Sequence, residues 1–228
     1  MLIEVYADLI CPWCYVGKAR LAMALAARPQ LRPELLHRPF QLNPDMPQGG
    51  LPRRVYLRLK FGSEERFAQV QDTIERTGRS AGIDFAFDRI ERTPSTRDGH
   101  RLLAFAHPFG LQQALIDRLY RAYFLEGADI GDRDVLLSLA AQVGLPPEPV
   151  RHLLETDEGA EAIMRSDRQA RHLGVTGVPF FVVDGRYALS GAQPPEVMIE
   201  MLDLVGQNSG GEPSLSAPER CEGAVAGS

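Results

Sequence analysis

The β-forming segments of this 228-residue chain lie only near its two ends, and this arrangement restricts the fold more than any other feature. Residues 2–7 and 35–40 form the first pair of predicted strands. The β pattern returns at 180–183 and 186–190, where Asp184 and Gly185 predict a tight hairpin turn. From about 51 to 171, apolar residues instead recur at helical spacing. We therefore expect the two ends to join in one four-stranded sheet, with a helical block inserted between them.

Helical periodicity is found between the first two strands, throughout the middle block and after the last strand. The predicted helices are 12–27, 52–60, 63–81, 96–107, 111–125, 132–143, 147–154, 157–172 and 194–204. A block of this length cannot be a loop in a compact domain, so we expect it to bury a small core of its own. The chain then divides into 1–50 and 172–206, which form an α/β sheet unit, an all-helical insertion at 51–171, and a tail at 207–228 whose composition predicts disorder.

Composition excludes several classes of function. The net charge is −5 and the basic residues are scattered, so no nucleic-acid groove is expected. No stretch of 18 or more apolar residues predicts a membrane span. The acidic, strand-like start at residues 1–10 does not resemble a secretory leader, and we therefore expect a cytoplasmic protein. Three cysteines are too few for a disulfide-stapled scaffold, and two of them lie close together at positions 11 and 14.

Cys11 and Cys14 enclose Pro12 and Trp13 in a C-x-x-C motif. Cys11 follows a predicted strand and begins a predicted helix, where unpaired N–H groups and the helix dipole favour a thiolate. Cys14 lies one helical turn further on, close enough to reach Cys11. This spacing predicts a redox-active disulfide in which Cys11 is the exposed nucleophile. Cys14 would be the shielded thiol that resolves a mixed disulfide with substrate.

A second element lies far away in the sequence, where Pro179 stands just before a predicted strand. Proline cannot donate to a strand ladder, and a cis Val178–Pro179 bond explains its position. The turn would aim the backbone of Val178 at the cysteine sulfurs, where it can pair with an extended substrate. A zinc half-site is the alternative for Cys11 and Cys14, but no second C-x-x-C or C-x-x-H supplies further ligands, so no metal is expected.

Four motifs in this order resemble the DsbA-like family, and most closely its FrnE-like dithiol–disulfide isomerase branch. They are CPWCYVG at 11–17, RPFQLNP at 38–44, GVPFF at 177–181 and SGAQP at 190–194, with YRAYF at 120–124 and DIGD at 129–132 similar as well. The resemblance covers roughly residues 1–206. It implies a thioredoxin-like fold with an inserted helical domain, with Cys11 as nucleophile, Cys14 as resolving thiol and Pro179 as the cis proline.

Two departures from the family pattern stand out. The family carries a buried acid six residues before the first cysteine, but this chain has Val5 at that position. Asp8 is the nearest acid on the approach to Cys11. Whether Asp8 assists Cys14 or only caps a turn is left open by the sequence. The histidine that DsbA has between its cysteines is replaced by Trp13, which implies a less oxidising pair.

The resemblance also leaves a second enzyme class open. Kappa-class glutathione transferases and 2-hydroxychromene-2-carboxylate isomerases are similar in fold order, but have Ser at the Cys11 position. A non-enzyme module that uses both cysteines as ligands is a third reading. For the redox enzyme we expect Pro12, Trp13, Val178, Asn43 and Gln193 to contact thiol or disulfide substrates, which are proteins or small molecules. We expect no bound cofactor, glutathione as a candidate electron donor, and a monomer or homodimer.

Overall fold

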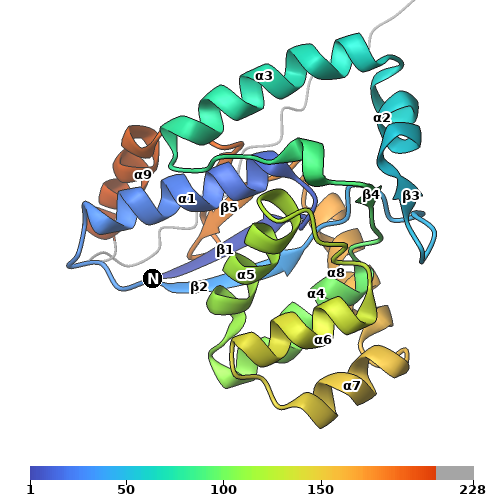
Figure 1. The fold of residues 1–228 in the computed structure, drawn as a ribbon. Helices are drawn as coiled ribbons and strands as arrows, with labels where there is room; N and C mark the ends of the chain where they lie inside the picture. The colour runs from blue at the N-terminus through green and yellow to red at the C-terminus, as the bar shows by residue number, and fades with distance from the viewer. Residues whose placement is uncertain (209–228) are drawn as a thin grey trace, which may run out of the picture.

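The computed structural model describes residues 1–208, and a mixed four-stranded sheet lies at its centre (Figure 1). The strands are β1 (Leu2–Ala7), β2 (Glu34–Pro39), β5 (Phe180–Val183) and β6 (Tyr187–Ser190), in the order β2-β1-β5-β6. β2 is parallel to β1, whereas β5 is antiparallel to β1 and β6 is antiparallel to β5. The expectation that the two ends of the chain build one helix-flanked mixed sheet is confirmed.

The two faces of the sheet are covered by different helices. Ile3, Val5 and Phe181 are buried in the main core, on the face where α1 (Pro12–Ala26) and α9 (Pro195–Asn208) lie side by side. Tyr6 alternates to the opposite face, as the two-residue period of a strand requires. There it belongs to a smaller cluster with Ala170 of α8 (Ala160–His172).

The last helix, α9, continues beyond the predicted end at 204, so residues 207 and 208 of the expected tail are helical. The remainder of that tail, including Cys221, lies outside the described residues.

The middle block is helical, as its periodicity predicts (Figure 1). Its helices before α8 are α2 (Arg53–Phe61), α3 (Glu64–Ser80), α4 (Arg97–Ala106), α5 (Gln112–Phe124), α6 (Arg133–Gln142) and α7 (Pro147–Glu155), with 3₁₀ turns at Phe87–Arg89 and His107–Phe109. Two short strands, β3 (Leu51–Pro52) and β4 (Arg92–Thr93), pair antiparallel and were not expected from the sequence. None of the helices in residues 1–208 has the length and apolarity needed to cross a membrane.

The helical block does not bury a separate core. Its buried side chains and those of the sheet form one continuous cluster. One link is Tyr15 of α1, which stacks on Tyr120 and Phe124 of α5 with ring centroids 5.0 and 5.9 Å apart. Phe85 contacts the same ring edge-on at 6.0 Å. The buried side chains of the block thus continue into those of the sheet unit, and the division of the chain at 51 and 171 stays a prediction.

Candidate active site

Cys11 and Cys14 lie where β1 gives way to α1. Cys11 is the N-cap residue of the helix in extended conformation, with Pro12 at its first turn. The backbone carbonyl of Cys11 accepts hydrogen bonds from the N–H groups of Cys14 and Tyr15 at 3.0 and 3.3 Å. This fixes the two cysteines one helical turn apart, as the sequence predicts. Both are free thiols.

Cys14 is held in its protonated form by its surroundings. Its side chain is 2% exposed, and burial raises the pKa of the thiol well above its ordinary value. A hydrogen bond to Cys11 and the negative charges of Cys11 and Asp8 raise this pKa further, while a hydrogen bond with the backbone of Asp8 opposes the rise. Cys14 therefore carries a proton that it must lose before it can attack a disulfide.

Cys11 is less exposed than the sequence suggests. Its exposed fraction is 4%, the carbonyl of Val178 lies against its sulfur, and it lines a cavity to which the helical block also contributes. The Sγ atom lies 3.7 Å from the Val178 carbonyl oxygen, to which the thiol donates. Cys11 is reached through a cavity rather than from open solvent.

The Val178–Pro179 peptide bond is cis, as predicted from the position of the proline before β5. Pro179 packs tightly against Gly17 of α1. A Cβ atom on Gly17 would lie 2.7 Å from Cγ of Pro179 and 3.2 Å from Cζ of Phe181. Glycine is thus required at position 17 for the proline turn to approach the helix that carries both cysteines.

A cavity of about 320 Å³ opens beside Cys11. The sheet unit contributes Cys11, Pro12, Trp13 and Val178 to its wall, and most of the rest of the wall comes from the helical block. The lining residues of α2 and α3 are Arg53, Tyr56, Leu57, Lys60, Phe61, Phe67, Val70 and Ile74. The wall is mainly apolar and aromatic, and its volume is within the range of small-molecule sites.

Asp8 is a fully buried carboxylate next to the cysteines. Its Oδ2 accepts a hydrogen bond from the N–H of Leu42 at 2.7 Å, and its Oδ1 lies 3.4 Å from Nε2 of His100. Neither Oδ1 nor Nε2 has a hydrogen-bond partner of good geometry among the described residues. The backbone carbonyl of Asp8 accepts from the Cys11 N–H at 3.2 Å. A buried acid thus lies next to the cysteine pair, but it is Asp8 and not the residue at position 5, where the family carries its acid.

The strand–helix junction with two cysteines, the cis proline and the order of the sheet all point to one family. Residues 2–203 match the description "DSBA-like thioredoxin domain". The chain belongs to the DsbA-like thioredoxin family. The thioredoxin-like fold that the four motifs implied is therefore confirmed. The FrnE-like branch stays a prediction.

Three solved structures illustrate how far this DsbA-like likeness reaches. A probable DsbA oxidoreductase from Streptomyces coelicolor is 37% identical, with a TM-score of 0.83 and full coverage of both chains. The cytosolic disulfide reductase DsbM from Pseudomonas aeruginosa, solved with GSH, is 23% identical with a TM-score of 0.65, over 91% of this chain and 100% of that one. A 2-hydroxychromene-2-carboxylate isomerase is 14% identical with a TM-score of 0.69, over 92% and 98%. The last two show the shared fold alone.

The remaining residues expected at the site lie outside this cavity. The Asn43 amide donates to the Tyr56 hydroxyl at 3.2 Å, which places it beside the wall but not in it. The Gln193 amide donates to the Ser190 carbonyl at 2.9 Å in the loop before α9. Sequence reasoning missed Arg53 and Lys60 as lining residues and His100 as the neighbour of Asp8. The run of basic residues in α2 was the one available signal for the first two.

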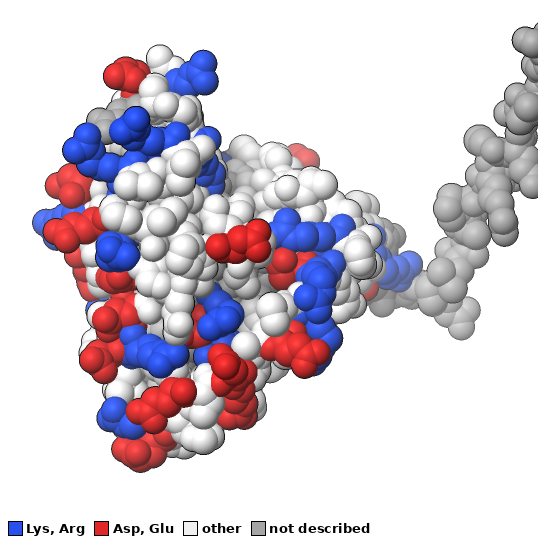
Figure 2. All heavy atoms as spheres, turned by 90° about the vertical axis from the view of Figure 1, so that its right-hand side faces the viewer, with Lys and Arg blue, Asp and Glu red and all other residues white. Residues whose placement is uncertain are grey.

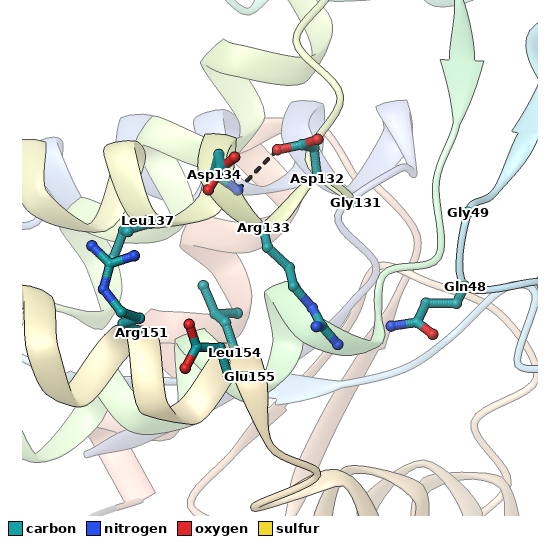
Figure 3. Close-up of a pocket in the computed structure, with 10 residues that line it drawn as sticks. All are labelled: Gln48, Gly49, Gly131, Asp132, Arg133, Asp134, Leu137, Arg151, Leu154 and Glu155. Carbon is teal, nitrogen blue, oxygen red and sulfur yellow. Dashed lines mark hydrogen bonds between the residues drawn. The ribbon is translucent and has the colours of Figure 1, made fainter.

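A larger hollow of about 530 Å³ lies between α6 and α7 and the turn at Gln48, away from the cysteines (Figure 3). Two of its charged residues have structural partners. Asp132 accepts from the N–H groups of Asp134 and Val135 as the N-cap of α6, at 2.9 and 3.0 Å. Arg133 lies 3.8 Å from Asp98. This hollow contains no nucleophile, and we do not assign chemistry to it.

Proposed function

We propose that this member of the DsbA family catalyses thiol–disulfide exchange through Cys11 and Cys14. The observation that supports it is the pair itself: Cys11 lines a substrate-sized cavity, and Cys14 lies behind it with a hydrogen bond to Cys11. The Val178 carbonyl beside Cys11 offers a backbone acceptor for an extended substrate.

In the proposed reaction the Cys11 thiolate attacks one sulfur of a substrate disulfide. The substrate S–S bond breaks, one half leaves as a thiolate that takes up a proton, and the other half is bonded to Cys11. Cys14 then loses its proton, attacks Cys11 and releases the second thiol. The substrate gains two electrons and the protein keeps a Cys11–Cys14 disulfide. Asp8 is the buried carboxylate nearest this proton transfer, and we assign it the role of acceptor.

Return to the dithiol needs a reductant, for which we propose glutathione: two glutathione thiols reduce the Cys11–Cys14 disulfide and leave as glutathione disulfide. We also propose a cytoplasmic location, where such exchange runs towards reduction or isomerisation. The structural relative DsbM, described as cytosolic and solved with GSH, is consistent with both proposals.

The glutathione-dependent isomerase or transferase reading shares the fold but has no use for Cys14. The second cysteine distinguishes the two proposals, because a transferase needs one catalytic group at position 11 and no resolving thiol.

Insulin reduction with glutathione as donor tests the proposal in four proteins: wild type, Cys11→Ser, Cys14→Ser and Cys221→Ser. We expect the first two substitutions to abolish turnover, with Cys14→Ser accumulating a mixed disulfide on Cys11 that is visible by intact mass. Cys221→Ser is the matched control and should behave as wild type. Full activity of Cys14→Ser would overturn the redox mechanism and favour the transferase reading.

A further inference from the structure

We propose that the cavity beside Cys11 selects small disulfides whose thiol component carries a carboxylate, and that Arg53 and Lys60 bind this carboxylate. The inference rests on the proposed thiol–disulfide exchange and adds a substrate class to it.

The charge of the cavity wall is one-sided. Among the described residues that line it, Arg53 and Lys60 carry charge, both are basic, and no acid is present. Both come from α2, which has the sequence RRVYLRLKF and no acidic residue. Figure 2 shows several basic side chains, with acidic ones beside them, at the upper end of the molecule, where α2 and α3 lie in Figure 1, next to an uncharged surface. A cationic end on an otherwise apolar pocket fits a ligand with an apolar body and one anionic group.

Arg53 has no described carboxylate partner, unlike Arg28 and Arg101. Its guanidinium lies 5.6 Å from the ring centre of Phe67 and 5.5 Å from that of Phe87. Its side chain donates a hydrogen bond to the Tyr123 hydroxyl at 3.5 Å, and none of the carboxylates whose side chains the structure describes forms an ion pair with it. Burial lowers the pKa of Arg53.

Several other arginines that are partly or wholly buried are paired with acids, whereas Arg20 bonds to the backbone carbonyl of Ala192. Arg101 bonds to Asp98 at 2.7 Å, and Arg28 bonds to Asp203 at 2.6 Å. A guanidinium has five N–H donors and costs free energy when it is buried without an anion. The spare donors of Arg53 are therefore suited to a carboxylate that arrives with the substrate, which two parallel N–H bonds can bind.

Lys60 extends the same positive end of the cavity at its exposed rim. Its ammonium donates to the Tyr56 hydroxyl at 2.8 Å, and the described part of the chain supplies it with no carboxylate. A hydroxyl leaves the ammonium its charge and two further donors. The half-buried Arg53 and the exposed Lys60 thus both offer donors to an anionic group of a substrate in the cavity that Cys11 also lines.

The test uses three symmetric disulfides that differ only in their terminal group: 3,3′-dithiodipropionate (anionic), bis(2-hydroxyethyl) disulfide (neutral) and cystamine (cationic). Reduced full-length protein is mixed with each, and oxidation is followed by the fluorescence of Trp13, the one tryptophan of the sequence. Each rate constant is divided by that of the same disulfide with dithiothreitol, which removes intrinsic reactivity. We expect the corrected rates to fall from anionic to neutral to cationic, with the extremes roughly tenfold apart or more.

Four variants assign that preference to residues. Arg53→Met should reduce the anionic-to-cationic ratio about tenfold, the value of one charge-assisted hydrogen bond, and Arg53→Lys should restore part of it. Lys60→Met, on an exposed side chain, should reduce the ratio without dependence on core packing. Arg54→Met, next to Arg53 but not in the cavity wall, is the matched control and should keep the wild-type ratio. Raised salt should compress the preference.

The outcomes separate this inference from the proposed function. Equal corrected rates for the three disulfides in wild type would overturn the carboxylate site and leave the exchange chemistry intact. The same conclusion would follow if Arg53→Met lowered all three rates equally and Lys60→Met had no effect. No reaction with any of them would overturn the proposed function. In that case Cys14→Ser protein, equilibrated with equal amounts of the anionic and cationic disulfides, gives a second measurement. Intact mass showing no excess of the mercaptopropionate adduct on Cys11 would overturn the inference as well.

Discussion

Gly17→Ala tests whether the close approach of α1 to the proline turn holds the site together. Elsewhere in a helix interior this change stabilises by about 0.5–1 kcal/mol, since alanine is the better helix former. Here the new Cβ lies 2.7 Å from Cγ of Pro179. Ordinary carbon contacts lie at about 3.5–4.0 Å, so the turn and the helix must separate by about 1 Å.

Overpacking of a dense core costs about 1–3 kcal/mol, which exceeds the gain in helix propensity. We expect a net loss of about 1–2 kcal/mol and, for a protein of this size, a fall in Tm of about 2–8 °C. Because the Cys11 Sγ lies only 3.7 Å from the Val178 carbonyl, the same displacement should also slow the reaction of Cys11 with substrate. Thermal unfolding and the rate of Cys11 oxidation measure the two effects.

Gly206→Ala is the matched control, because Gly206 is also helical but a Cβ there would meet nothing within 4 Å. It should leave Tm unchanged or raise it slightly and should not alter Cys11. If Gly17→Ala raises Tm as Gly206→Ala does, the argument that glycine is needed for the approach of Pro179 is refuted.

Three further perturbations follow from buried charges. Because folding raises the pKa of Cys14, the stability that this thiol contributes is fully present below the ordinary pKa of a cysteine and is lost as the pH rises beyond it. Urea unfolding of reduced protein from pH 7 to 10.5 should therefore show a steeper loss of unfolding free energy in wild type than in Cys14→Ala, and parallel curves would contradict this. Asp8→Asn should lower the pKa of Cys14 by removing a negative charge, yet slow the release of substrate from the mixed disulfide. Alkylation at a series of pH values measures the first effect and single-turnover mass measurements the second; an unchanged pKa of Cys14 would exclude the interaction between Asp8 and Cys14. Arg101→Met should cost about 3–5 kcal/mol in urea unfolding, because it removes the nearest partner of the buried Asp98 and the donor to three backbone carbonyls. Arg165→Met on the exposed face of α8 should cost under about 0.5 kcal/mol, and a similar cost for the two would refute the reasoning.

The parts of the fold that the sequence predicts well are those set by local chemistry. Alternation at β1 and β5, proline at the start of α1 and the Asp184-Gly185 turn each act over a few residues, and together they determine the order of the sheet. The placement of Cys11 at a helix start follows in the same way.

Features that depend on distant contacts were not predictable. Asp8 and His100 meet only after α4 has packed near β1, and nothing local marks either residue as a partner of the other. The cavity beside Cys11 is built largely by α2 and α3, whose position next to this cysteine no periodicity specifies. The strands β3 and β4 have two residues each, too few for alternation to be detected.

The continuous core through Tyr15, Tyr120 and Phe124 has a consequence for how this architecture diversifies. A helical block with its own core would be a module, free to be exchanged between homologues and able to melt separately. Because this block shares aromatic stacking with α1, we expect it to unfold together with the sheet in one transition. New specificity is then acquired by point substitutions in α2 and α3, while a transplanted block brings the wrong partner for Tyr15 and lowers the stability of the helix that carries both cysteines.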